Sequence, residues 1–245
     1  MDKQQVIFED MGVIDYKSAW DYQEQLLLQN VNLKSAARKD GIIASDVPTQ
    51  HYFLLCEHTP VYTLGKSGNI NNVLINETER KEREIEFFQT NRGGDITFHG
   101  LQQVVGYPIL DLEKFYTDIG VYLRNLEEVI ILTIAAYGIK GERSSGETGV
   151  WISPGIKGKE RKICAIGVRC SRWITMHGFA LNVNTDLNYF NHIIPCGIEN
   201  KQVTSIEKET GAKVNYEEVK IKLKENFEKV FNVQLLFNNH PVSSI

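Results

Sequence analysis

A cysteine between a proline and a glycine is the first candidate for nucleophilic chemistry in this sequence. Cys196 lies in the segment IPCGI, residues 194–198, and such flanking residues are typical of a constrained turn. A thiol on a turn is less buried than a thiol in a strand, and a nearby cation lowers its pKa from about 8.5. Because most cysteines in such turns are structural, reactivity depends on a partner for Cys196.

Lys162 is the candidate partner, because it opens the otherwise apolar segment RKICAIGV, residues 161–168. A lysine at the start of a strand is more often a solvated end. Where burial removes part of its hydration, its pKa falls from about 10.4 and it can exchange protons near neutral pH. The pair then predicts covalent catalysis by a thiol with a lysine base, provided that the fold brings the two together.

The segment RGGDITFHG, residues 92–100, has the composition of a binding loop that leads into a strand. Its paired glycines let the backbone approach a ligand closely. A strand here would place Thr97 and His99 on one side and Ile96 and Phe98 on the other. An ordinary glycine turn is the alternative interpretation.

The segment HGFALNV, residues 177–183, suggests a slot for an alkyl chain. Small Gly178 and Ala180 flank Phe179, as an apolar ligand pocket would require. Gly167, in the segment that Lys162 opens, would also allow backbone contact with a ligand. The alternative is a half-buried strand with a phenylalanine in the core.

Two other kinds of site use the same polar residues. His99, His177 and Cys196 could ligate a metal ion, but their spacing matches no metal motif and no carboxylate joins them. Cys196 with His99 or His177 could also form the dyad of a thiol peptidase. The sequence contains no GxSxG, P-loop or GxGxxG motif, which argues against serine hydrolases and nucleotide-dependent enzymes.

Composition narrows the class of protein. The chain has 245 residues, 42% of them hydrophobic and 24% charged, with a net charge of −4. This size fits one large domain, and the absence of a basic excess argues against nucleic acid as the principal partner. The N-terminal residues resemble no secretory signal, and no apolar run is long enough to span a membrane. We expect a cytoplasmic protein whose other cysteines, Cys56, Cys164 and Cys170, are reduced core residues.

Hydrophobic periodicity predicts a mixed sheet flanked by helices, an α/β or α+β fold. The expected helices cover residues 16–38, 118–137 and 217–231, and residues 76–84 form an exposed helix or loop. The expected strands cover residues 52–56, 61–64, 85–90, 103–110 and 233–237, together with a strand-rich block over 149–183. We expect a single catalytic domain over residues 1–245, with a small C-terminal lobe from about residue 205 left open.

Taken together and in this order, RGGDITFHG, KICAIGV, HGFALNV and PCGI resemble the octanoyl-acyl-carrier-protein:protein octanoyltransferases. This family is also called lipoate biosynthesis protein B or lipoyl(octanoyl) transferase. The segments EHTPVYTLG, residues 57–65, and VTSI, residues 203–206, look similar to it as well. The resemblance covers roughly residues 10–230.

The resemblance implies a fold shared with biotin and lipoate protein ligases. It also implies transfer of an octanoyl group from acyl carrier protein to a lysine of a lipoyl domain. Such domains belong to the E2 subunits of 2-oxoacid dehydrogenases and to the glycine cleavage H protein. The acyl group would be carried as a thioester on Cys196, with Lys162 as the acid–base partner, and without a cofactor or metal ion.

The resemblance also implies the residues of the acyl pocket. They are Arg92, Gly93, Gly94, Asp95, Ile96, Thr97, Phe98, His99, Ala165, Ile166, Gly167, Gly178, Phe179 and Ala180. Backbone N–H groups would have to hold the tetrahedral oxyanion, and Gly167 and the turn at Cys196 are the candidates.

One departure from the family pattern lies beside this pocket. The family usually continues its His-Gly pair with Pro-Gly-Gln, whereas this chain has Leu101-Gln102-Gln103. Two alternative functions remain open. They are an ATP-dependent ligase of the lipoate or biotin type, and a non-catalytic acyl-binding module.

Overall fold

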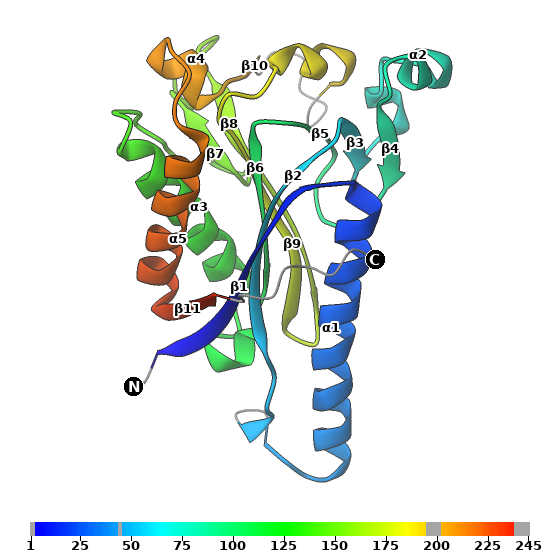
Figure 1. Cartoon of the computed structure of the whole chain (residues 1–245), viewed down its shortest axis with the longest axis vertical. Coiled ribbons are helices and arrows are strands. Elements are labelled where there is room, and N and C mark those ends of the chain that lie inside the picture. Colours follow the sequence, from blue (N-terminus) through cyan, green and yellow to red (C-terminus); the bar gives the residue numbers. More distant parts are fainter. Residues whose placement is uncertain (1–2, 44–45, 195–201, 238–245) are drawn as a thin grey trace.

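A mixed sheet organises most of the chain in the computed structural model, which describes residues 3–43, 46–194 and 202–237 (Figure 1). Within these residues an eight-stranded sheet has the order β10-β8-β9-β6-β2-β1-β11, and β7 pairs with β8. The pairs β1–β2 and β1–β11 are parallel, whereas β2–β6, β6–β9 and β8–β9 are antiparallel. A smaller sheet of order β4-β3-β5 lies beside it.

The elements have the following bounds. The strands are β1 (Gln4–Ile14), β2 (His51–His58), β3 (Val61–Leu64), β4 (Glu86–Gln89), β5 (Ile96–His99), β6 (Gln103–Ile109), β7 (Val150–Ile152), β8 (Arg161–Ser171), β9 (Ile174–Asn182), β10 (Gln202–Val203) and β11 (Val233–Phe237). The helices are α1 (Tyr16–Lys39), α2 (Glu77–Glu82), α3 (Ile119–Ala135), α4 (Ile206–Thr210) and α5 (Tyr216–Phe231). Within the described ranges no helix is both long and apolar enough to cross a bilayer.

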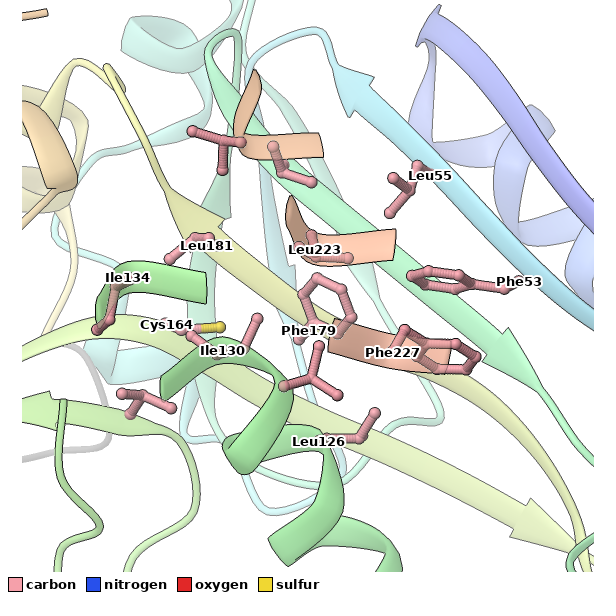
Figure 2. Packing of buried hydrophobic residues seen from close by; sticks show 14 of the residues in the cluster. Phe53, Leu55, Leu126, Ile130, Ile134, Cys164, Phe179, Leu181, Leu223 and Phe227 are labelled. Carbon is pink, nitrogen blue, oxygen red and sulfur yellow. The ribbon is translucent and has the colours of Figure 1, made fainter. Parts of the chain in front are cut away.

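Helices α3 and α5 cover one face of the large sheet and enclose the main core (Figure 2). The buried residues of α5 recur every three or four positions, which places them on one helical face. Phe227 of this face stacks on Phe53 of β2 with ring centroids 4.1 Å apart. Residues 206–237 therefore belong to the same core as the rest of the chain, because α5 packs on α3 and β11 pairs with β1.

Helix α1 covers the opposite face of the sheet (Figure 1). Asp15 caps its N-terminus by accepting a hydrogen bond from the backbone N–H of Ser18. Near its other end, the buried ammonium of Lys34 lies 2.7 Å from the buried carboxylate of Asp111. The cap stabilises the first turn of the helix, and the ion pair joins its other end to the residues that follow β6.

The helices predicted from periodicity are confirmed to within about three residues at each end, and the strand 233–237 has the predicted bounds. Strand β1 was not predicted. Its apolar run, residues 6–8, is short beside the eleven residues of the strand, and only Val6 and Phe8 are buried. The strand-rich block resolves into β7 and the long antiparallel pair β8–β9.

The residues that replace the family's Pro-Gly form the turn between β5 and β6. Gln102 has a left-handed backbone, with φ of 60°, which a glycine would adopt without strain. Its backbone N–H donates to the carboxylate of Glu57 at 2.6 Å, and its side-chain oxygen accepts from the amide of Asn184 at 2.9 Å. These bonds compensate for the strained conformation of a residue that has a side chain.

We predict that Gln102→Gly changes the free energy of unfolding by less than about 1 kcal/mol, because relief of strain offsets the lost contact. Gln102→Val should cost about 2 kcal/mol, because a β-branched residue tolerates this backbone poorly. Urea unfolding of the two variants beside the natural protein measures both values. Equal losses in the two variants would contradict this account of the turn.

A buried histidine joins the end of β1 to β2 and β6. The Nδ1–H of His58 donates to the carbonyl of Ile14 at 2.9 Å, and its Nε2 accepts from the hydroxyl of Tyr107 at 2.7 Å. These bonds require a neutral ring. Burial lowers the pKa of His58 to about 4.

This histidine should make the fold sensitive to acid. An unfolded histidine has a pKa of about 6.5, so between pH 6.5 and 4 the unfolded chain binds a proton that folded His58 does not. The free energy of unfolding therefore falls as the pH falls through this window. From pH 7.5 to pH 5, His58→Gln should lose about 1–2 kcal/mol less than the natural protein. Urea midpoints at the two pH values test this, and equal losses would count against it.

Candidate active site

A cavity of about 530 Å³ lies along β8 and β9, beneath the loop formed by residues 92–95. This volume is in the range of sites for small ligands. Lys162 lines the cavity, and so do all the residues predicted for the acyl pocket except Phe98. The lining is mainly apolar, and its polar side chains include Lys162, Arg92 and His177.

The register of β8 and β9 shows which lining residues lie at each end of the cavity. Ala165 pairs with Ala180, and Val168 pairs with His177. Lys162 precedes Val168 by six residues on β8, a rise of about 20 Å along the strand. The lysine and His177 therefore lie near opposite ends of the lining, with small residues between them.

The loop at residues 92–94 covers the end of the cavity that lies far from Lys162. The backbone N–H of Gly93 donates to the carbonyl of Val168 at 3.0 Å. A side chain on Gly167 would lie 2.7 Å from the carbonyl oxygen of Gly93, so only glycine permits this approach. The guanidinium of Arg92 donates to the carbonyl of Thr63 at 2.6 Å and to its hydroxyl at 2.9 Å. These contacts fix the loop on the edge of the sheet.

The same hydrogen bond bears on the expected oxyanion donor. The carbonyl of Val168 faces Gly93 and not β9. Since backbone groups of successive residues alternate along a strand, those of Gly167 face β9. The expectation that the N–H of Gly167 faces a ligand is thus not supported, whereas the backbone of Ile166 faces outward.

Polar side chains connect the two sheets behind the cavity. The hydroxyl of Thr63 lies 3.2 Å from Nε2 of His99, and the Nδ1–H of this ring donates to the Gln103 side chain at 2.9 Å. The Gln103 amide nitrogen donates to Asn182 at 2.8 Å, and Asn182 donates to the carbonyl of Thr204 at 2.9 Å. Burial, with a contribution from the guanidinium of Arg92, lowers the pKa of His99 well below its usual value, so the ring acts as a neutral link.

Strand β5 alternates as predicted. Thr97 and His99 line the cavity, whereas Phe98 packs with Tyr62 in the small core beside β3. Ile96 belongs to this small core and also touches the cavity. Phe98 therefore supports the site from behind.

Asp95 lines the cavity, but its carboxylate holds a neighbouring loop. It accepts hydrogen bonds from the backbone N–H of Asn69 at 3.2 Å and from the amide of Asn72 at 2.6 Å. The carbonyl of Asn72 accepts from the backbone N–H of Ile194 at 2.8 Å. Asp95 therefore fixes the last described residues before the segment that carries Cys196.

Strand β9 contributes to the cavity differently from what its sequence suggests. A side chain on Gly178 would lie 2.1 Å from the backbone oxygen of Gly106, so this glycine makes room for β6 rather than for a ligand. The ring of Phe179 belongs to the core beneath α3 and α5 (Figure 2). Ala180 is the β9 residue whose small side chain leaves space on the cavity side, opposite Ala165.

Lys162 is half-buried at the other end of the cavity. Its Nζ lies 4.5 Å from the centre of the Trp151 ring, a favourable cation–π distance. The backbone of Gly149 passes close to its alkyl chain, since a side chain there would lie 3.5 Å from the Cε of Lys162. Val203 of β10 pairs with Lys162 on the strand.

Cys196 lies outside the described residues, as does the rest of the segment 195–201. The described chain stops at Ile194, which is bonded to Asn72, and resumes at Gln202, which pairs with Arg161 next to Lys162. Cys56 and Cys164 are buried, and Cys170 is half-buried. Burial raises the pKa of all three thiols.

Several lining residues were not predicted from the sequence. They are Tyr16, Gln103, Val105, Tyr107, Ile119, Leu123, Glu147, Thr148, Val168, His177, Asn182, Phe190 and Val203. Val168, His177, Asn182 and Val203 lie within segments that the sequence analysis singled out, and Gln103 lies three residues after another, so these residues could have been included on that ground. No sequence motif indicates that Tyr16 lines the cavity, because the pattern around it predicts only the first residue of an amphipathic helix.

The alternative metal and peptidase sites gain no support from the described residues. Both ring nitrogens of His99 contact protein groups, and the Nε2 of His177 contacts Asn91 at 2.7 Å. No three His, Cys, Asp or Glu side chains gather in a way that could hold a metal ion, as far as residues 3–43, 46–194 and 202–237 are concerned.

Comparison with known proteins gives the family. The family model for the lipoyl protein ligase A/B catalytic domain matches residues 15–228. An octanoyltransferase of Christiangramia forsetii is 55% identical over 95% of this chain and 98% of its own length. An octanoyltransferase of Flavobacterium johnsoniae is 54% identical over 93% of this chain and 97% of its own length.

Solved structures agree on the fold. A lipoate-protein ligase A bound with ATP superposes with a TM-score of 0.67 at 12% identity, over 97% of this chain and 89% of its own. A bipartite lipoate protein ligase of Thermoplasma acidophilum gives a TM-score of 0.66 at 15% identity, over 97% and 87% of the two chains. The predicted mixed sheet of the lipoate ligase type is confirmed. The chain therefore belongs to the lipoyl protein ligase A/B catalytic-domain family and, within it, to the octanoyltransferases, which are acyltransferase enzymes.

Proposed function

We propose that this enzyme transfers an octanoyl group from acyl carrier protein to a lysine of a lipoyl domain, through a thioester on Cys196. The observation that carries the proposal is an apolar cavity with Lys162 at one end and the loop at residues 92–94 covering the other end. The relatives of this chain are octanoyltransferases. Such a cavity suits a saturated acyl chain whose reactive carbonyl stays beside the lysine. The reaction uses no cofactor or metal ion.

In the first step the Cys196 thiolate attacks the carbonyl carbon of the donor thioester. Lys162 takes the proton of the thiol, and the resulting ammonium stabilises the thiolate. The bond to the sulfur of the carrier breaks, and the departing thiolate takes the proton from Lys162. One thioester replaces another, so this step needs activation rather than a driving force.

In the second step the amine of the acceptor lysine attacks the acyl-enzyme. The bond between the carbonyl carbon and the sulfur of Cys196 breaks, and the amine proton passes by way of Lys162 to that sulfur. The product is an amide, which is more stable than the thioester. We propose lipoyl domains of 2-oxoacid dehydrogenase E2 subunits and the glycine cleavage H protein as acceptors in the cytoplasm.

The described geometry supports the pairing of Lys162 with Cys196. Ile194 and Gln202, the described residues on either side of the cysteine segment, are both held by hydrogen bonds near the cavity. The second of these enters β10, which pairs with β8 at Arg161 and Lys162. The described chain thus resumes beside the lysine, six residues after Cys196.

The covalent step predicts an acyl-enzyme. After mixing with octanoyl carrier protein, the intact mass should rise by one octanoyl group, and Cys196→Ala should abolish both the adduct and the transfer. A variant with Cys56, Cys164 and Cys170 changed to serine should still form the adduct, because burial keeps those thiols protonated. Activity should persist without ATP and magnesium, which separates transfer from ligation. Natural turnover in Cys196→Ala would refute the thioester.

The acid–base step predicts a large effect at Lys162. Arginine keeps the positive charge beside Trp151 but does not release a proton near neutral pH. Lys162→Arg should therefore lower kcat about 100-fold or more while the donor KM changes little. In the same assay Lys162→Ala should also raise the pH at which iodoacetamide alkylates Cys196. Retention of most of the activity in Lys162→Arg would leave the lysine with a purely electrostatic role.

A further inference from the structure

His177, at the covered end of the cavity, has a strained backbone. Its φ of 57° is in the left-handed region, which few residues other than glycine adopt, and its side chain is 1% exposed. Its backbone N–H donates to the side-chain oxygen of Gln23 in α1 at 2.9 Å. Strain of this kind persists where surrounding contacts impose it, and it concentrates at binding sites.

The contacts of the ring select one tautomer. Asn91 donates its amide nitrogen to Glu24 at 2.9 Å, which leaves the amide oxygen of Asn91 facing His177. This oxygen lies 2.7 Å from Nε2 of His177 and accepts its proton. In a neutral ring the other nitrogen, Nδ1, then carries an unshared electron pair.

The Nδ1 atom is buried and has no hydrogen-bond partner among the described residues. Burial, with a contribution from the nearby cations of Arg92 and Arg169, lowers the pKa of His177 to about 3. The ring is therefore neutral over the working range of an enzyme, and Nδ1 remains an acceptor. A buried acceptor without a donor costs free energy. A ligand that brings a hydrogen-bond donor to the His177 end of the cavity would remove this cost.

The rest of the lining contrasts with this end. Between Lys162 and His177 the strands present the small residues Ala165 and Ala180, and Gly167 marks where the loop at residues 92–94 closes over the strand. Such a path accommodates a saturated chain, while the ring of His177 offers it a polar terminus.

We infer that the His177 end of the cavity is a subsite for a hydrogen-bond donor at the far end of an acyl chain, such as a terminal hydroxyl. This inference rests on the proposed function in one respect, that the acyl carbonyl lies at the Lys162 end. A chain that ends in a methyl group and reaches His177 leaves Nδ1 unpaired. A chain of the same reach with a terminal hydroxyl satisfies it. His177 thus determines specificity and does not take part in the chemical steps.

Direct binding tests the subsite without acyl transfer. Calorimetry with Cys196→Ala protein compares saturated fatty acids of about eight to sixteen carbons with their terminal-hydroxy counterparts, because the longest of these span the roughly 20 Å rise between Lys162 and the residue that pairs with His177. At the length that reaches His177, the hydroxy acid should bind about tenfold more tightly than the plain acid of equal reach. The nitrogen-15 resonance of Nδ1 should shift with the hydroxy acid and not with the shorter plain acids. No preference at any length would overturn the inference.

Two variants assign the preference to the ring nitrogen. His177→Phe keeps a ring but removes Nδ1, and it should reduce the hydroxy-to-plain affinity ratio to about one. His177→Asn tolerates the left-handed backbone and retains a side-chain oxygen as acceptor, so it should keep part of the preference. A full preference in His177→Phe would place the subsite elsewhere.

These results are independent of catalysis. Failure of octanoyl transfer in the natural protein, with the binding preference intact, would refute the proposed function and leave the subsite standing. Successful transfer without a binding preference would do the reverse.

Discussion

The side-chain amide of Gln103 is the contact on which the geometry of the cavity depends. Its oxygen accepts from His99, and its nitrogen donates to the carbonyl of Phe98 and to Asn182. One planar group thereby holds β5, β6 and β9 at fixed positions. A buried amide that lost any of these partners would carry an unsatisfied polar atom, so the network forms as a unit. The two sheets are positioned by this group, and the cavity is the space that they enclose.

The charges of the site follow from the same low-dielectric surroundings. The buried histidines are held neutral, because burial lowers the pKa values of His58, His99 and His177. The guanidinium of Arg92 donates to Thr63 and to the carbonyl of Gly93, which satisfies most of this buried cation. The polar groups around the cavity therefore position the backbone, and the half-buried Lys162 lies at the opposite end of the lining.

Local sequence patterns predicted the helices and the side-chain alternation of strands, because both depend mainly on residues close together in the sequence. Helical spacing of apolar residues gave α1, α3 and α5, and alternation along β5 placed Thr97 on the cavity side. Close approach between strands is a tertiary property, however, so the role of Gly178 beside β6 could not be read from its own segment. The unsatisfied nitrogen of His177 is likewise visible only once α1 and the residue 91 loop are in place. Motif order indicated the cavity lining well, because those segments are the strands that build it.

The pairing of β1 with β11 has a consequence for how the chain acquires its structure. These strands come first and last among the described elements, yet they are neighbours in the sheet (Figure 1). During synthesis, β1 can pair with β2 early, but its second edge stays open until residues 233–237 have left the ribosome. Long-range pairing of this kind slows folding, and an open strand edge is a site of intermolecular association. During most of its synthesis the nascent chain therefore has an unpaired edge on β1 that can pair with strands of other chains. A product truncated before β11 would keep this unpaired edge permanently.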